Sequence, residues 1–278
     1  MFEFQANKNN PQKLLTILER FTRWWFAEPP DDETGVSQER LQHVDIPTPL
    51  KRLYSFAGEW PGGTWESIFS HQDHLCPFEC LHERDGKIVF AWENQGVWIV
   101  ATDFNGDDPP VYLSIDDGPF EQFCDSLSRF LVTFCLHESV FGAETLSPVA
   151  DITSINIANS KIPIPIWLNA PYPNASTEGY SLSFFLVDGC VLQMGNWCGG
   201  REPSLQQRYP YFFSENTTNR NVSSPQKRSL WENPEVPSFI KRNHLEMLIR
   251  RHENVSASHL QKADHYKTLL ANLNQPPR

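Results

Sequence analysis

The 278-residue sequence lacks an uninterrupted apolar run long enough to cross a bilayer. Residues 180–194 come nearest, but Asp188 interrupts them, whereas a spanning helix needs about 20 predominantly apolar residues. The first ten residues, MFEFQANKNN, contain no basic segment leading into an apolar one, as a secretory signal would. We therefore expect no insertion into a membrane and a cytoplasmic location.

The common catalytic motifs are also missing. The sequence has no Gly-x-Ser-x-Gly nucleophile turn, no His-Glu-x-x-His zinc helix and no glycine-rich loop that would hold a phosphate group. We therefore expect a protein that is not an enzyme and that uses no cofactor.

Histidine and cysteine are concentrated in one segment, and this leaves an alternative open. Residues 71–82 hold five possible zinc ligands, His71, His74, Cys76, Cys80 and His82. They lack the paired Cys-x-x-Cys spacing that is typical of structural zinc, so we predict no metal site. The alternative is an uncharacterised metal-dependent hydrolase or metal-binding protein that uses this loop. The six cysteines form no compact framework, which favours free and mostly buried thiols.

Charge is distributed unevenly along the chain. Residues 1–145 contain 10 basic and 24 acidic residues, whereas residues 146–278 contain 13 basic and 10 acidic ones. An acidic surface repels nucleic acid and attracts basic proteins, so we predict a protein partner and no direct binding of nucleic acid. The simpler alternative is that the acidic residues only keep the protein soluble.

Hydrophobic periodicity predicts three helices. Asn10 can cap a first helix that starts at Pro11 and places apolar residues at helical spacing up to Trp25. A second helix is predicted over residues 47–58, with Gly58 at its end in a conformation of positive φ. A third is predicted over residues 119–137, where a histidine near the helix end would interact favourably with the helix dipole.

Alternating and β-branched residues predict an antiparallel sheet. Residues 87–92 and 97–102 should form a hairpin, 111–115 a third strand, and 162–168 an irregular edge strand. Residues 180–187 and 190–195 should pair around an Asp188-Gly189 turn after the chain returns to the sheet. Asn94 and Gln95 are expected to satisfy backbone groups of a turn.

The predicted class is therefore α+β, a mostly antiparallel twisted sheet flanked by helices, with a C-terminal helical extension. Residues 1–213 should form one domain. Residues 214–234 are polar and rich in Ser and Asn, which predicts a linker, and residues 235–278 can form two basic amphipathic helices.

Several segments follow one another in a distinctive order. The helix at 46–58 precedes ENQGVW at 93–98 and DDPPVY at 107–112, and SLSRFL at 126–131, VFGA at 140–143 and IPIPIW at 162–167 follow in order. Together they resemble the SUKH superfamily over residues 10–200. The resemblance implies a protein-binding module, such as an immunity protein that neutralises a toxin, often a nuclease, or an adaptor.

An inhibitor that offers carboxylates to a basic cleft can associate quickly with its target. We therefore predict a basic toxin domain as the partner and a contact surface made of Glu59, Trp60, Asp103, Asp107, Asp108, Asp116 and Asp117. The alternative is that these are solvated loop residues, because few surface residues dominate binding.

Overall fold

A computed structural model describes residues 2–26, 34–59, 67–148, 163–174 and 179–202, together with the backbone of 218–219. Trp60, most of the predicted linker and the predicted helical tail at 235–278 lie outside the described residues. Strand β12 (Thr218–Asn219) falls within the range predicted as a linker and pairs with β7 (Thr145–Pro148).

Runs of helices and runs of antiparallel strands follow one another along the chain, which confirms the predicted α+β class. The helical segments are η1 (Gln5–Asn7), α1 (Pro11–Trp25), α2 (Gln38–Gln42), α3 (Thr48–Ala57), η3 (Phe78–Cys80) and α4 (Leu127–Phe141). The remaining strands are β1 (His74–Leu75), β2 (His82–Arg84), β3 (Lys87–Trp92), β4 (Trp98–Thr102), β5 (Val111–Ile115), β6 (Glu121–Cys124), β8 (Ile164–Tyr172), β9 (Tyr180–Val187), β10 (Val191–Met194) and β11 (Trp197–Gly200).

The strands form two antiparallel sheets. Sheet A has the order β1-β3-β4-β5-β6, with β2 also paired to β3. Sheet B has the order β12-β7-β11-β10-β9-β8. The chain after Gly142 therefore builds a second sheet. The prediction that it returns to the first sheet is wrong. The proline-containing strand β8 lies at an edge of sheet B, as predicted, because proline cannot donate to a neighbouring strand.

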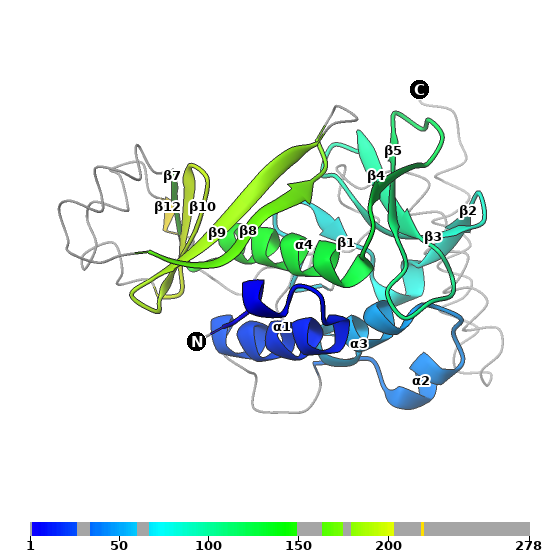
Figure 1. The fold of residues 1–278 in the computed structure, drawn as a ribbon, viewed down its shortest axis with the longest axis horizontal. Helices are drawn as coiled ribbons and strands as arrows, with labels where there is room; N and C mark the ends of the chain where they lie inside the picture. Colours follow the sequence, from blue (N-terminus) through cyan, green and yellow to red (C-terminus); the bar gives the residue numbers. More distant parts are fainter. Residues whose placement is uncertain are drawn as a thin grey trace, which may run out of the picture.

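Helix α4 lies at the centre of the molecule, between the two sheets (Figure 1). Thirteen of its fifteen residues are buried, so it is covered on all sides, unlike a surface helix with one apolar face. Two tryptophans attach other elements to it. The indole of Trp25 in α1 donates to the Ser139 carbonyl at 3.0 Å, and that of Trp167 in β8 donates to the Thr133 hydroxyl at 2.9 Å.

Helix α1 follows the prediction closely. The Asn10 side chain accepts a hydrogen bond from the Lys13 backbone N–H at 3.0 Å, and Pro11 occupies the first helical position. The buried residues are those at the predicted apolar spacing, from Leu14 to Trp25. Helix α1 packs against both α3 and α4 (Figure 1), so its apolar face closes the helical side of the core.

The predicted hairpins are confirmed. Strands β3 and β4 pair antiparallel, with Ile88 opposite Thr102 and Trp92 opposite Ile99. Strands β9 and β10 pair around residues 188–190, since Val187 lies opposite Val191. Asp188 and Gly189 both have positive φ, at 49° and 71°, a conformation that Asp tolerates and that Gly adopts readily in turns.

The third helix was predicted in the wrong place. Residues 121–124 form strand β6, which pairs with β5, and the helix runs from Leu127 to Phe141. Phe120 and Phe123 match a helical period by their spacing, but pairing with β5 satisfies the backbone there. Tertiary context thus overrides a short local pattern.

Gly58 ends α3 in a different way from the one predicted. Its φ is −70°, so it does not use the left-handed conformation. A Cβ at this position would lie 2.7 Å from Cγ2 of Val36 and 2.8 Å from the Tyr54 carbonyl oxygen. Glycine is needed here because of the close approach of these neighbours.

The six cysteines are free thiols, as predicted, and Cys124 alone among them is only half-buried. Among the described helices, none combines the length and the apolar character that crossing a membrane would require.

Asp108 holds the start of α4 in place. Its carboxylate accepts hydrogen bonds from the Ser128 backbone N–H at 2.6 Å and from the hydroxyl groups of Ser126 at 2.5 Å and Ser128 at 3.0 Å. The N-terminal N–H groups of a helix have no partner within the helix, so a carboxylate at this position stabilises it.

We predict that Asp108→Ala lowers the free energy of unfolding by about 1–2 kcal/mol, the usual effect of losing a helix cap. The exposed neighbour Asp107 provides the control, and Asp107→Ala should stay within about 0.5 kcal/mol of the wild type. Urea unfolding followed by circular dichroism measures both values. Equal stabilities of the two variants would contradict the capping role.

Candidate functional site

The predicted contact residues lie in separate loops. Asp103, Asp107 and Asp108 lie in the loop between β4 and β5, whereas Asp116 and Asp117 lie in the turn between β5 and β6. These are opposite ends of β5, a strand of five residues that spans about 17 Å.

Most of these carboxylates already have partners within the protein. Asp103 pairs with the Lys87 ammonium at 2.9 Å, and Asp117 pairs with Arg84 at 3.1 Å. Glu59, after α3, forms an ion pair with Arg40, and Asp108 caps α4. Within the described part of the chain, only two members of the predicted set are exposed and make no ion pair or side-chain hydrogen bond, Asp107 and Asp116.

A cavity of about 400 Å³ opens where the two sheets approach α4, and we call it the central recess. Its floor is made by Asp73, His137 and Tyr172, and its rim includes the exposed rings of Tyr180 and Trp197. Its volume falls within the usual range for ligand-binding pockets.

The motif that carries the family resemblance forms one wall of the central recess. Glu93, Gln95, Val97 and Trp98, which belong to ENQGVW, all line it. The backbone N–H of Asp116 donates to the Val97 carbonyl at 2.9 Å, so the turn at Asp116 and Asp117 adjoins this wall. The other predicted group, around Asp107, lies at the far end of β5.

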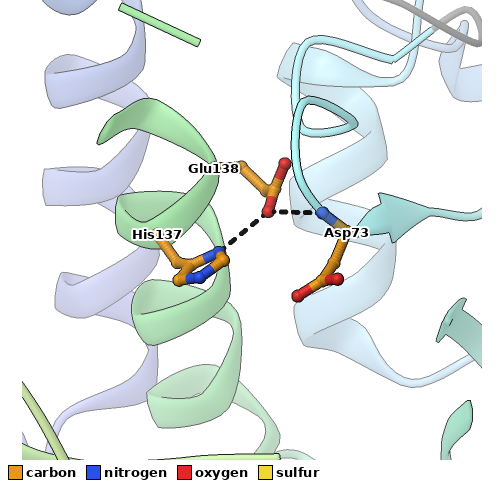
Figure 2. A group of neighbouring side chains, drawn as sticks. All are labelled: Asp73, His137 and Glu138. Atoms are coloured by element: carbon orange, nitrogen blue, oxygen red, sulfur yellow. Dashed lines mark hydrogen bonds and ion pairs between the residues drawn. The ribbon is translucent and has the colours of Figure 1, made fainter. Parts of the chain in front are cut away.

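Below the floor, the buried carboxylate of Glu138 organises the site. One oxygen accepts the backbone N–H groups of His71 at 2.6 Å and Gln72 at 2.8 Å. The other oxygen accepts the backbone N–H of Asp73 at 3.0 Å and Nδ1 of His137 at 2.9 Å (Figure 2). Burial alone would raise the pKa of Glu138, but these hydrogen bonds and the charge of His137 hold it below its usual value. The carboxylate is therefore ionised.

The hydrogen bonds around His137 define its tautomer. Because an ionised carboxylate can only accept, Nδ1 of His137 must carry the proton that is shared with Glu138. The Tyr172 hydroxyl lies 3.0 Å from the same nitrogen, and its ring stacks on the imidazole with centroids 4.2 Å apart. Nε2 has no hydrogen bond within the described part of the chain, and His137 lines the central recess.

Asp73 is the second carboxyl group of the floor. It accepts hydrogen bonds from the Tyr172 hydroxyl at 2.6 Å and the Asn94 backbone N–H at 3.3 Å. Burial and the nearby charge of Glu138 raise the pKa of Asp73 from 3.8 to about 7, although His137 and both hydrogen bonds oppose this shift. Near neutral pH, Asp73 is thus divided between its protonated and ionised forms.

The backbone N–H groups of the turn after β3 have a different acceptor from the one predicted. The carboxylate of Glu93, not the side chains of Asn94 and Gln95, accepts the backbone N–H groups of Gln95 at 2.8 Å and Val97 at 3.2 Å. The side-chain oxygen of Asn94 is buried without a hydrogen bond among the described residues.

Among the described residues, no three of the five side chains considered as zinc ligands bring their ligand atoms close together. The ring of His71 stacks on Phe26, while His74 lies against Trp92, and burial lowers its pKa to about 4. Cys76 and Cys80 belong to a small apolar cluster on the side of sheet A that includes Val89 and Ile99, and Nδ1 of His82 lies 3.0 Å from the Cys80 carbonyl.

In the described ranges, one group has metal-binding side chains close together, Asp73, His137 and Glu138, whose ligand atoms lie within 4.8 Å of one another. Both oxygens of Glu138 already accept two hydrogen bonds each, so a cation bound there would have to displace backbone donors. The donor set therefore favours a structural role for Glu138.

Comparison with known proteins gives no match to any family model, curated protein or solved structure. The proposed function therefore depends on the geometry of the site.

The sequence patterns do not predict the central recess. The position of His137 near a helix end indicates a structural role, and Asp73 lies between two histidines in a segment without clear periodicity. One signal was present, since the adjacent charged pair His137-Glu138 interrupts a strongly apolar helix. A carboxylate inside such a helix is stable only when hydrogen bonds compensate its burial.

Replacing Glu138 tests its organising role. We predict that Glu138→Gln destabilises the protein by about 3 kcal/mol, because the amide group would place N–H donors against backbone donors. Glu121→Gln, an exposed change in β6, should have almost no effect. Urea unfolding of each variant and of the wild type gives both differences in the free energy of unfolding. A decrease below 1 kcal/mol for Glu138→Gln would contradict this role.

The raised pKa of Asp73 predicts a pH-dependent stability. Because the folded protein keeps this proton up to about pH 7, the contribution of Asp73 is full below pH 3.8 and is lost as the pH rises through 7. Asp73→Asn should remove this loss, so the variant gains up to about 4 kcal/mol relative to the wild type between pH 4 and pH 8. His74 titrates in both proteins and cancels in the difference. If the difference in unfolding free energy between Asp73→Asn and the wild type does not change with pH, the raised pKa of Asp73 is contradicted. Asp45→Asn, an exposed change, is the control.

Proposed function

We propose that this protein is a non-catalytic protein-binding module of the SUKH kind, and specifically an immunity protein that binds and neutralises a basic toxin domain. The observation that supports this most directly is the combination of 24 acidic and only 10 basic residues in residues 1–145 with a recess to which the described residues contribute no Lys or Arg. Opposite charge accelerates encounter with a basic protein and disfavours nucleic acid itself.

The location of the two resemblance motifs supports the proposal. The ENQGVW segment lines the central recess, and the DDPPVY segment carries the Asp108 cap of α4 and a further contact, the Leu127 backbone N–H to the Pro109 carbonyl at 2.8 Å. One motif thus shapes a surface depression, and the other positions the helix on which that depression rests. Such an arrangement suits a rigid binding surface.

The described lining of the central recess contains no Ser, Thr, Cys or Lys, so a nucleophile of these residue types has no support there. The alternative, a metal-dependent hydrolase that uses the His71–His82 loop, has less support, because no three of these five side chains bring their ligand atoms together in the described part of the chain.

The exposed acids at the two ends of β5 provide a test. We predict that the double variant Asp107→Lys with Asp116→Lys slows association with a basic nuclease toxin domain by at least about tenfold at low salt, because both steering charges are reversed. Stopped-flow fluorescence at 50 and 300 mM salt measures the rate, and the effect should shrink at high salt.

The matched control reverses two exposed acids outside these loops, Glu3→Lys with Asp45→Lys, and produces the same change in net charge. Equal slowing by both pairs would show that only net charge matters and would reject the proposed contact surface. Failure of candidate basic toxin domains to form any salt-sensitive complex with the wild type would reject the function itself.

A further inference from the structure

We propose that the central recess binds one arginine side chain presented by a basic partner, with the guanidinium group on the floor and the aliphatic stem between the aromatic rings. This inference rests on the proposed function for the source of the arginine, but the site itself can be tested with small molecules.

The polar groups of the floor are hydrogen-bond acceptors. Asp73 offers a carboxyl group on the floor of the recess. Glu93 uses only one carboxylate oxygen for the turn, which leaves the other one available beside the cavity. Several acceptors in different directions match a guanidinium group, which has five N–H donors in a planar fork, better than the compact ammonium group of lysine.

Aromatic rings form a continuous wall around these acceptors. Trp98 meets Tyr172 edge-on at 6.1 Å between ring centroids, and Tyr172 lies 5.7 Å from Tyr180. On the other side, His137 contacts Phe141, which in turn lies 5.5 Å from Trp197. Aromatic faces attract cations, and a guanidinium group also stacks on them.

The exposure of the rim indicates that the wall is accessible. Tyr180 and Trp197 are two of the three large apolar side chains that are markedly exposed among the described residues, at 43% and 37%, and both line the central recess. Aromatic residues at the mouth of a pocket that is acidic inside are what a partner's cationic side chain would meet first.

Electrostatics exclude the opposite kind of ligand. Two carboxyl groups line the cavity, and a third, Glu138, lies directly beneath it, while no Lys or Arg is present in the described lining. An anion would therefore be repelled. A bound cation would relieve the repulsion between Asp73 and Glu138 that contributes to the raised pKa of Asp73.

The same repulsion makes binding depend on pH. A cation favours ionised Asp73, so affinity should rise by about tenfold from pH 6 to pH 8 as Asp73 loses its proton. The groups that face Asp73 and act on it are His137 and Glu138 from α4, Tyr172 from β8 and Tyr180 from β9, with Glu93 from the turn after β3 on the same cavity.

The experiment titrates the full chain with N-acetyl-arginine methylamide, its neutral isostere N-acetyl-citrulline methylamide and the corresponding lysine compound. Changes in tryptophan fluorescence and in NMR chemical shifts report binding. We expect the arginine compound to bind with a Kd of about 1 mM at pH 8, a typical affinity for a single side chain, and the other two to bind at least about fivefold more weakly. Equal binding of arginine and citrulline compounds, or tighter binding of lysine, would overturn the inference.

Two variants place the binding in the central recess. Trp197→Ala removes an exposed ring without disturbing the core, and Asp73→Asn removes the charge but keeps the shape. Each should weaken binding of the arginine compound by about tenfold, and Asp73→Asn should also abolish its pH dependence. Ile164→Ala, an exposed apolar change in β8 outside the recess, is the control and should leave the affinity unchanged. Unchanged affinity in both recess variants would overturn the site.

The same variants separate this inference from the proposed function. If a basic toxin domain binds the wild type and binds Trp197→Ala and Asp73→Asn equally well, the arginine site is wrong and the binding function stands. If the arginine compound binds in the recess but no basic protein forms a salt-sensitive complex, the site stands and the immunity function is wrong.

Discussion

The structure depends on how one buried charge, the carboxylate of Glu138, is satisfied. A carboxylate without partners in the interior would cost several kcal/mol, and replacing it by a protonated acid would leave the adjacent backbone donors unpaired. Four hydrogen bonds solve this problem, three from the successive N–H groups of residues 71–73 and one from His137. Because these donors come from the segment before β1, the start of sheet A is fastened to the central helix by a polar contact. Apolar packing alone would not define this position so closely.

Tyr172 extends the same network to sheet B. Its hydroxyl donates to Asp73 and lies beside His137, so a strand of sheet B, a loop before sheet A and helix α4 meet at a few atoms. The consequence is electrostatic as well as structural. Burial, together with the nearby charge of Glu138, raises the pKa of Asp73 to about 7. A protein that maintains such crowding at the base of an open cavity has an unfavourable charge arrangement that a cationic ligand can relieve.

The local elements could be predicted because their determinants are local. Asn10 with Pro11 defines the start of α1, and Asp188 with Gly189 defines the hairpin of sheet B. The failures have nonlocal causes. Strand β6 is stabilised by pairing with β5, although the spacing of Phe120 and Phe123 suggests a helix. Ser126, the N-cap of α4, is held by a hydrogen bond to the distant Asp108. The floor of the central recess joins residues 73, 137 and 172, and no pattern within a single segment could indicate that they meet.

The predicted acidic surface and the central recess act over different distances, which explains how both can serve one function. Charges at the ends of β5 act through solvent over about one Debye length and so affect the rate of encounter. The central recess acts only after contact, when a side chain leaves water and its hydrogen bonds are formed inside a partly enclosed cavity. Desolvated contacts of this kind determine how slowly a complex dissociates. The turn at Asp116 adjoins the wall of the recess through its hydrogen bond to Val97, so a partner steered toward that end of sheet A would arrive beside the cavity.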